Sequence, residues 1–363
     1  MSGLILKKAK LIMTEKKDEE VELREELDGK VTAKDYFSVM KTDIDNFNYM
    51  AWNKKAGFKA PSFPIMTEKM EGFDSGLYIF AGAANAGKTA IMLNMMEDLC
   101  MNEENNLFGV YFSLDDSKQK VIPRIVAMRE RIPITVVSKP TRYSDLIIGD
   151  PENAKYYQEL LDKRDQGLKN LKDDSNKMII FDTTDIRNAD DMHDCILQIN
   201  NYVKAIDPET KIMVGIDSLK DIEFPSDKYG KLTTNEKVDI AAKTVKDWST
   251  ELDIMVFASM HLRKLNTDKR PTTDDLKESN TLEYEANVCF LIYNDVSRNK
   301  EGAKVYHTKD DEPEKLPVLE IDWAKNKQSS YKGRSFCYFS PEYSKAVECS
   351  EEANVRFNAM IMS

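Results

Sequence analysis

One stretch of the chain combines residue types and spacing that bind phosphate: Gly82-Ala83-Ala84-Asn85-Ala86-Gly87-Lys88-Thr89. An apolar run over 76–81 precedes it, and a helix-favouring run over 90–96 follows it. A strand, a glycine-rich turn and a helix start in this order direct backbone N–H groups and the positive helix end to one point. We therefore predict a nucleoside triphosphate site in which Lys88 contacts the β- and γ-phosphates and the Thr89 hydroxyl binds Mg²⁺.

A second acid is expected at the end of a neighbouring buried strand, where it holds Mg²⁺ through water. Two continuous apolar runs end in aspartate, one at Asp182 and one at Asp217. Asp217 is followed by a loop, a capped helix and the apolar run 254–259, which is the order that suits the second acid. We favour Asp217, and we expect Asp182 to bond a turn at its own strand end.

A further acid should orient the attacking water. The apolar run 110–114 leads directly into Asp115 and Asp116. Either carboxylate could instead cap the helix that begins near Ser117, because acids are favourable at helix N-termini. We predict that Asp115 is the catalytic base and that Asp116 is the cap.

The elements that must position these residues alternate between strands and helices, which predicts an α/β domain with a largely parallel sheet. Helices are expected over 121–130, 189–204 and 235–252, and the polar segment 163–177 is expected to be a connection. The expected strands end at Leu114, Asp182, Asp217, Met260, Tyr293 and Asp322.

Three regions are expected along the chain: a charged extension over 1–58, the α/β domain over 59–348 and a tail over 349–363. In the extension, a mixed-charge run over 16–26 is typical of a solvated, partly disordered segment. Thr32 could cap a helix through Tyr36, Phe37, Met40 and Ile44, which would lie on the main domain or on a neighbouring subunit.

Composition narrows the class of protein. The 363 residues are 41% hydrophobic and 32% charged, which describes a globular chain, and no apolar stretch is long enough to span a membrane. The five cysteines include no C-x-x-C pair, so we expect a reducing cytoplasm. The net charge of −11 excludes a uniformly basic surface but leaves room for a local basic track.

Several separated motifs over roughly 59–348 resemble the RecA-like motor domain of DnaB-type hexameric replicative helicases. They are the stretch 72–89, the run that ends at Asp115, Asp217, and the segment KRPTTDDLKESN over 269–280, where the family has KRP…DLRESG. The likeness continues through 282–287, through Lys325 and Lys327, and through 339–343. It implies a RecA-like P-loop NTPase domain with a short N-terminal extension, ATP and Mg²⁺ as cofactors, and a homo-oligomer that forms a hexameric ring.

The resemblance also implies roles for single residues. Lys88 and Thr89 hold phosphate and Mg²⁺, Asp217 is the second acid on the metal side, and Asp115 is the general base. Lys325 and Lys327 reach the γ-phosphate of the neighbouring subunit's nucleotide. His261 resembles the γ-phosphate-sensing histidine of phage primase-helicases; the alternative is a strand-end histidine that bonds a carbonyl.

Three departures from the family pattern affect what the resemblance implies. Asp115 stands where the family usually has glutamate, and Lys327 stands where it has an arginine finger with a bidentate fork. Both departures bear on the rate of turnover. From the resemblance we also expect no counterpart of the long helical N-terminal domain that docks primase in bacterial relatives, which bears on a primase or loader as partner.

In RecA-like folds, loops after the second-acid and sensor strands face the ring centre, here about 219–232 and 261–280. The second loop is rich in cations, which alone would be read as a solvated surface. With the resemblance, we predict sequence-independent contacts to single-stranded DNA from seven residues. They are Arg263, Lys264, Lys269, Arg270, Lys277, Ser279 and Asn280.

The sequence thus predicts an ATP-driven, ring-forming DNA helicase that translocates on single-stranded DNA in replication. Two rivals remain open at this point. One is a RecA- or KaiC-like oligomeric ATPase that does not unwind DNA. The other is a nucleotide-switched binding module with little turnover.

Overall fold

The computed structural model describes residues 33–53, 57–262, 269–276, 280–309 and 313–362. The chain divides into two units, Met1–Ala56 and Gly57–Ser363. In the first unit, helix α2 covers Ala33–Asn53, which confirms the expected helix. Thr32, its expected cap, and the charged run 16–26 lie outside the described residues. Several apolar side chains of α2 are exposed, among them Phe47 and Trp52.

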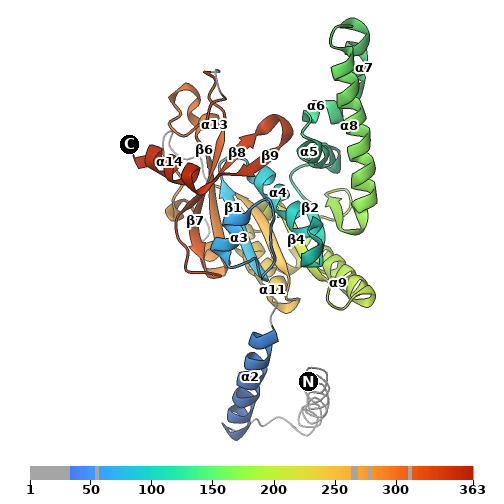
Figure 1. Ribbon diagram of the computed structural model, residues 1–363. Coiled ribbons are helices and arrows are strands. Elements are labelled where there is room, and N and C mark those ends of the chain that lie inside the picture. The colour runs from blue at the N-terminus through green and yellow to red at the C-terminus, as the bar shows by residue number, and fades with distance from the viewer. Residues whose placement is uncertain (1–32, 54–56, 263–268, 277–279, 310–312, 363) are drawn as a thin grey trace, which may run out of the picture. The chain divides into compact units, whose positions relative to one another are not determined.

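The second unit is built on a nine-stranded sheet with the order β3-β2-β4-β5-β1-β6-β7-β8-β9. Strands β3, β2, β4, β5, β1 and β6 pair in parallel, and β7, β8 and β9 continue the sheet in antiparallel fashion. The largely parallel sheet is therefore confirmed (Figure 1). The strands are β1 Gly76–Gly82, β2 Leu107–Ser113, β3 Met178–Asp182, β4 Lys211–Asp217, β5 Met255–His261, β6 Val288–Asn294, β7 Val318–Asn326, β8 Arg334–Ser340 and β9 Lys345–Glu348.

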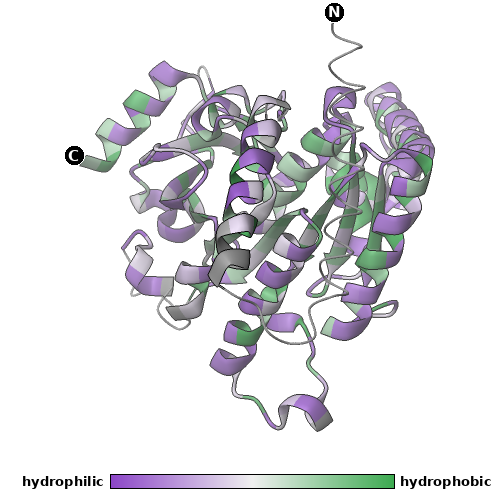
Figure 2. Cartoon of the chain, turned by 90° about the horizontal axis from the view of Figure 1, so that it is seen from below, coloured by the Kyte–Doolittle hydropathy of each residue, from purple (hydrophilic) through white to green (hydrophobic). Residues whose placement is uncertain are grey.

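Helices cover both faces of the parallel part, which explains why its central strands are continuous apolar runs. Along β1, Tyr78 and Phe80 pack into one core with α4, while Leu77 and Ile79 pack into another with α9 and α11. Figure 2 shows hydrophobic residues concentrated along the strands and polar residues on the outer sides of the helices. The helices of the second unit are α3 Pro64–Met70, α4 Lys88–Met101, α5 Lys118–Glu130, α6 Ile134–Ser138, α7 Pro140–Gly149, α8 Ala154–Asp173, α9 Ala189–Ile206, α10 Ser226–Tyr229, α11 Thr234–Glu251, α12 Asn280–Glu285, α13 Asp295–Asn299 and α14 Glu351–Met362.

The three helices expected from the sequence are present as α5, α9 and α11. Helix α11 begins with a complete capping box: the Thr233 hydroxyl accepts from the Glu236 N–H, and the Glu236 carboxylate accepts from the Thr233 N–H. Its apolar face, including Val238, Val245 and Trp248, is buried in the core shared with β1. Among the described residues, no helix has the length and apolar character needed to cross a membrane.

The expectation of a connection over 163–177 is wrong, because α8 runs through most of this segment to Asp173. Its charged residues conceal a narrow apolar stripe in which Leu160, Leu168 and Leu171 pack against residues of α5 such as Val126. Helix α8 stands beside α5 near the β3 edge of the sheet, and α7 packs on α8 (Figure 1). In the sequence alone, the many charged residues of this segment hide the helical spacing of so few apolar residues.

The segment 349–363, expected to be a tail, forms α14 through Met362 and packs on the antiparallel edge of the sheet. Phe357 is fully buried, and its ring lies 5.5 Å from that of Phe336 and 6.0 Å from that of Tyr338, both on β8. The domain therefore extends past residue 348, because α14 covers an apolar face of β8 that would otherwise meet water.

We predict that Phe357→Ala lowers the free energy of unfolding by about 3–5 kcal/mol, the cost of emptying a fully buried aromatic site. Chemical denaturation followed by circular dichroism measures this change. Val355→Ala, in the same helix but 69% exposed, should change it by less than about 0.5 kcal/mol. Equal, small effects of the two substitutions would show that α14 is a dispensable tail.

Candidate nucleotide-binding site

The phosphate loop connects the end of β1 to the start of α4 and has no room for larger residues at its glycines. Gly87 has φ +96°, and a Cβ there would lie 2.8 Å from the Leu319 side chain. A Cβ on Gly82 would lie 2.6 Å from the Ile292 carbonyl oxygen. The motif is therefore required by backbone geometry as well as by phosphate. Asn85 (φ 60°) lies exposed within the loop, between Ala84 and Ala86, and we expect the backbone of Ala83, Ala84, Asn85 and Ala86 to contact phosphate.

Lys88 is the buried cation of the loop, with 5% of its surface exposed. Its ammonium group donates to the Ala83 carbonyl at 2.8 Å and lies 3.3 Å from Nδ1 of His261. Burial lowers the Lys88 pKa to about 8, Asp217 opposes this shift, and Lys220 adds to it. A phosphate bound here would favour the charged ammonium, so ligand charge and lysine charge stabilise each other.

Asp217 lies at the end of β4, beside Thr89. Its Oδ2 accepts from the Thr89 hydroxyl at 2.6 Å and from the Tyr111 hydroxyl at 3.2 Å, and its Oδ1 accepts a short bond from Ser259. A hydroxyl next to a carboxylate is a set of hard oxygen donors, which Mg²⁺ prefers. Thr89 and Asp217 therefore fit the metal role expected for them, and together they would hold Mg²⁺ beside the phosphate loop.

Asp182, the rival second acid, has a different place. Its Oδ1 accepts from the backbone and hydroxyl of Thr184 at 2.9 and 2.6 Å, and its Oδ2 accepts from the Lys118 N–H at 2.8 Å. These bonds lower the Asp182 pKa to about 2, with the Thr184 hydroxyl bond as the largest cause. Asp182 thus bonds a turn, as expected, and also supports the first turn of α5.

The two adjacent carboxylates after β2 point to different partners. Asp116 forms ion pairs with Lys120 at 2.8 Å and Arg124 at 3.0 Å on α5. Asp116 contacts the helix through these ion pairs and not through the cap expected from the sequence: the Ser117 side chain makes no cap bond, and the Lys118 N–H at the helix start donates to Asp182. Asp115 is 55% exposed, its Oδ2 lies 4.0 Å from Nε2 of His261, and its N–H donates to the Asp217 carbonyl.

His261 ends β5 between Lys88 and Asp115. Burial lowers the His261 pKa, and the nearby Lys88 and Lys220 lower it further. This shift favours the neutral ring near pH 7, and a neutral ring that accepts from the Lys88 ammonium at Nδ1 carries its N–H on Nε2, the nitrogen nearer to Asp115. This placement brings the expected γ-phosphate sensor into the same cluster as the phosphate loop and the expected base.

Three residues of this cluster were not identified from the sequence: Tyr111, Ser259 and Lys220. Tyr111 and Ser259 lie inside β2 and β5 and were read there as ordinary strand residues. Lys220 follows Asp217 on a short 3-10 turn, Leu219–Asp221, which packs against β5 and α11. The sequence signal that could have identified these three residues is their position near the carboxyl end of a strand, because the carboxyl ends of parallel strands meet at one edge of the sheet.

Lys325 lies level with the middle of β1, and Lys327 lies closer to the amino end of that strand. In the strand register, Lys325 is level with Cys289 and Ile79, whereas the phosphate loop starts after Gly82. Both ammonium groups donate to the Tyr284 carbonyl, at 3.0 and 3.3 Å. They are therefore directed away from the phosphate loop of their own chain.

The residues expected to contact DNA are described only in part. Arg263, Lys264, Lys277 and Ser279 lie outside the described residues, and Asn280 is described only as the first residue of α12. Lys269 is exposed, as a phosphate contact requires.

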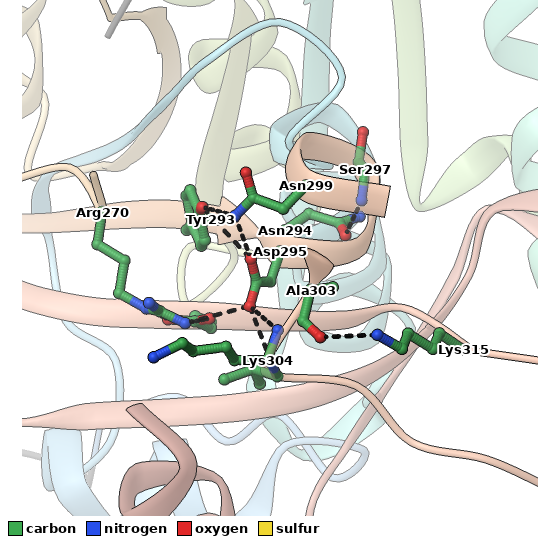
Figure 3. A network of polar contacts seen from close by, with 11 residues as sticks. Arg270, Tyr293, Asn294, Asp295, Ser297, Asn299, Ala303, Lys304 and Lys315 are labelled. Atoms are coloured by element: carbon green, nitrogen blue, oxygen red, sulfur yellow. Dashed lines mark hydrogen bonds and ion pairs between the residues drawn. The ribbon is translucent and has the colours of Figure 1, made fainter. Parts of the chain in front are cut away.

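Arg270 has a different environment from the one expected. Its guanidinium donates to both carboxylate oxygens of Glu320, at 2.7 and 2.8 Å, and lies 3.4 Å from Oδ2 of Asp295 (Figure 3). Because these buried carboxylates occupy the guanidinium, we correct its expected role from a DNA contact to an anchor of the loop.

Comparison with known proteins agrees with this geometry. Residues 60–347 match the family model of the DnaB-like helicase C-terminal domain. The replicative DNA helicase DnaB of Geobacillus stearothermophilus is 25% identical over 296 residues, which cover 78% of this chain and 55% of that protein. DnaB of Mycoplasma pneumoniae is 23% identical over 247 residues, which cover 65% of this chain and 46% of that protein. The chain thus spans about half the length of these relatives.

Two solved structures have the same fold. One is an isolated ATPase domain, which superposes with a TM-score of 0.65 at 20% identity, covering 89% of this chain and 100% of that one. A DnaB-like replicative helicase, solved in a study that includes its interactions with primase, gives a TM-score of 0.65 at 20% identity, with 89% and 68% covered. These matches confirm the expected RecA-like α/β fold.

The two neighbouring acids can be separated by experiment. We predict that Asp115→Asn lowers the rate of ATP hydrolysis by roughly two to four decades with nucleotide affinity retained, the loss expected for a general base. Asp116→Asn should lower it far less, because Asp116 contacts α5 and not the cluster. Steady-state phosphate release and fluorescent-nucleotide titration measure the two quantities. A larger loss for Asp116→Asn would assign the base to the other carboxylate.

Proposed function

Because the chain belongs to the DnaB-like helicase C-terminal domain family, we propose that it is the ATP-driven motor of a ring-forming replicative DNA helicase. In this proposal it translocates on single-stranded DNA and works in a reducing cytoplasm, in keeping with five cysteines that are all free thiols. The observation that carries the proposal is the convergence of Lys88, Thr89, Asp217, His261 and Asp115 at one edge of the parallel sheet.

Each residue of this cluster has a chemical task in the proposal. Lys88 and the loop N–H groups bind the phosphates, while Thr89 and Asp217 hold Mg²⁺, which when bound neutralises charge on the phosphoryl oxygens. Asp115 is exposed, so its carboxylate is available to orient and deprotonate the attacking water. The Nε2–H of neutral His261 is placed to donate to a γ-phosphate oxygen and so to report its loss.

The nucleoside has a place next to the phosphate loop. A cavity of about 230 Å³ lies between loop residues 83–86 and the end of β6 with the start of α13. Its wall includes Tyr293, Asn294, Ser297 and Arg298, which offer an aromatic ring, polar groups and a cation. We propose that the sugar and base occupy this cavity.

A second copy of the chain is needed to complete the site. Lys325 and Lys327 point away from the phosphate loop of their own chain, and family membership suggests that they act on the nucleotide of the next subunit in a hexameric ring. Asn287, at the start of β6, fixes this region, because its carbonyl accepts from the Lys327 N–H and its side chain accepts from Lys246. The two lysines thus extend from a rigid part of the sheet.

Single-stranded DNA is the proposed track, and a loader or a primase is a further partner that family membership suggests. The loop that follows His261 carries the remaining proposed phosphate contacts, Arg263, Lys264, Lys269, Lys277, Ser279 and Asn280. Because contacts of cations to backbone phosphates release counterions and carry no sequence information, DNA binding by such a local group should be sensitive to salt and indifferent to sequence.

Unwinding of a labelled forked duplex tests the proposed function. We predict ATP-dependent strand separation and hydrolysis stimulated by single-stranded DNA. Both should be absent in Lys88→Ala, because this substitution removes the positive charge that stabilises the transferred phosphoryl group. Circular dichroism of Lys88→Ala controls for folding. Stimulated hydrolysis without unwinding would favour a RecA-like ATPase, and DNA binding controlled by nucleotide without turnover would favour a nucleotide-switched module.

Mixing of two inactive variants tests the shared site. We predict that Lys327→Ala and Lys88→Ala proteins, each inactive alone, recover partial ATPase activity when they assemble together, because some interfaces then join an intact loop to an intact Lys327. A finger arginine is worth about three to five decades in rate, and a lysine should give less because it lacks the bidentate fork.

The control mixes Lys88→Ala with the double variant Lys88→Ala/Lys327→Ala, in which no interface contains an intact phosphate loop. This mixture should stay inactive at every ratio. If mixed oligomers of the two single variants form and no ratio restores activity, Lys327 does not act in trans.

A further inference from the structure

The turn between β7 and β8 presents Lys327 to solvent on an anchored backbone. Lys327 is exposed, whereas its two chain neighbours are half-buried. The Lys327 N–H donates at 2.9 Å to the carbonyl of Asn287, which lies next to the start of β6. Asn287 also bonds β1, because its Oδ1 accepts from the Leu77 N–H at 2.9 Å and its N–H donates to the Leu77 carbonyl at 2.8 Å. The backbone at Lys327 is therefore tied to two neighbouring strands.

The side chain of Asn326, the last residue of β7, closes the turn around Lys327. Its Oδ1 accepts from the N–H groups of Gln328 and Ser329, at 3.0 and 3.2 Å. Its Nδ2 donates to the Ser329 hydroxyl at 2.8 Å and to the Tyr331 carbonyl at 3.3 Å. This set of bonds requires an amide, because a carboxylate only accepts and a hydroxyl donates only once.

Ser329 connects the same turn to α3. Its hydroxyl donates at 2.5 Å to the carbonyl of Lys69, in the last turn of α3, and accepts from the Asn326 amide and from the Tyr331 N–H. The one hydrogen and both lone pairs of this hydroxyl are thus in use. The Tyr331 ring lies 5.0 Å from that of Trp323, and the Lys69 ammonium lies 4.8 Å over it. The turn is therefore held on α3 as well as on the sheet.

A third contact joins the turn to the strand that leads into the phosphate loop of the same chain. The Gln328 amide donates at 3.3 Å to the carbonyl of Ser75, directly before β1. Because the phosphate loop follows the other end of β1, the turn and the loop are attached to opposite ends of one buried strand. The backbone of the turn thus has little freedom to move relative to the rest of the domain.

A lysine that acts on a phosphate depends strongly on such support. It is a compact charge on a flexible stem, without the fork that aligns an arginine. A misplacement of about 1 Å can lower a rate by roughly 10²-fold. The Lys327 ammonium contacts the Tyr284 carbonyl at 3.3 Å, but it must leave this carbonyl to reach a phosphate. The bonds of Asn326 act on the backbone on the carboxyl side of Lys327, so they remain when the ammonium moves.

We propose that Asn326 is a positioning residue for the reaction shared between subunits: through its four bonds to residues 328–331 it presents Lys327 to the nucleotide of the neighbouring subunit. This inference rests on the proposed function, since it takes Lys327 as the cation that completes the next subunit's site. It adds that an uncharged amide, which itself contacts no ligand, sets the position of that cation.

Mixed oligomers of Lys88→Ala and Lys327→Ala protein allow one substitution to be tested in either subunit. The Lys88→Ala subunit supplies the intact Lys327, and the Lys327→Ala subunit supplies the intact phosphate loop. Asn326→Ala in the Lys88→Ala subunit should lower the recovered rate of ATP hydrolysis by roughly 10- to 100-fold, the cost of a misplaced group. In the Lys327→Ala subunit it should leave the recovered rate unchanged, because that subunit has no Lys327 to position.

This design separates positioning from stability. A substitution that merely weakened folding or assembly would lower recovery in whichever subunit carried it, and thermal melting and size-exclusion chromatography measure both properties. In the otherwise wild-type chain, Asn326→Ala should lower kcat by the same factor and leave the affinity for a fluorescent ATP analogue unchanged, because the phosphate loop is intact. Ser329→Ala removes the bond to α3 but keeps both Oδ1 bonds of Asn326, so it should give a smaller loss in the same subunit.

Two further variants test the chemistry of the turn. Asn326→Asp keeps the size and the accepting oxygen but loses both donated bonds, so it should lower recovery as Asn326→Ala does. Lys332→Ala removes an exposed cation from the same turn, and we expect it to keep the recovered rate in either subunit. A loss with Lys332→Ala equal to that with Asn326→Ala would show that the charge of the turn matters and not its geometry, and would contradict the inference.

The remaining outcomes distinguish the inference from the proposed function. If Asn326→Ala has the same effect in either subunit, whether no loss or an equal loss, Asn326 does not position Lys327 and the inference is overturned. If mixed oligomers form and show no recovery even without a change at Asn326, Lys327 does not act in trans and the inference fails with that assignment. Unwinding of a forked duplex by the wild-type chain would still support the helicase function in either case.

Discussion

The carboxylate of Asp217 imposes the strongest constraint on this structure. It is 5% exposed, and a buried charge is costly unless hydrogen bonds replace the water that it has lost. Three hydroxyls provide these bonds: Thr89 from the first turn of α4, Tyr111 from β2 and Ser259 from β5. Satisfying one carboxylate thus brings the phosphate loop and three neighbouring strands together, and the rest of the nucleotide site is arranged around that point.

The cations next to Asp217 favour an anionic ligand. Burial lowers the pKa of Lys88, and burial, together with Lys88 and Lys220, lowers the pKa of His261. Within a chain of net charge −11, this group is a local exception at the edge of the sheet. A bound phosphate would reduce the repulsion between Lys88 and Lys220. The favourable binding energy would therefore come from positive charges that the fold already holds in position.

The antiparallel strands serve a second purpose beyond closing the core. β7 supplies Glu320, which faces Arg270, and carries Lys325 near its end, with Lys327 directly after it; both ammonium groups contact the Tyr284 carbonyl. This part of the chain therefore carries Glu320, which holds Arg270, and the two lysines that we propose to act on the nucleotide of the neighbouring subunit. A rigid strand suits both roles, because it can relate positions at its two ends without bending.

Local patterns in the sequence determined the phosphate loop, the strands β1 to β7 and the helices α4, α5, α9 and α11, because each depends on neighbours only a few residues away. The glycine spacing of 82–87 and the capping box at Thr233 are such patterns. The sequence also placed Asp115 and His261 at strand ends, but their 4.0 Å separation requires that β2 and β5 flank β4, and strand order is not written in any local pattern. The same reason explains Arg270, whose partners lie 25 and 50 residues along the chain, and α8 and α14, whose narrow apolar stripes make sense only beside α5 and β8. Which of these side chains contact one another was decided only by the tertiary structure, because residues far apart in the sequence become neighbours only when the strands and helices pack.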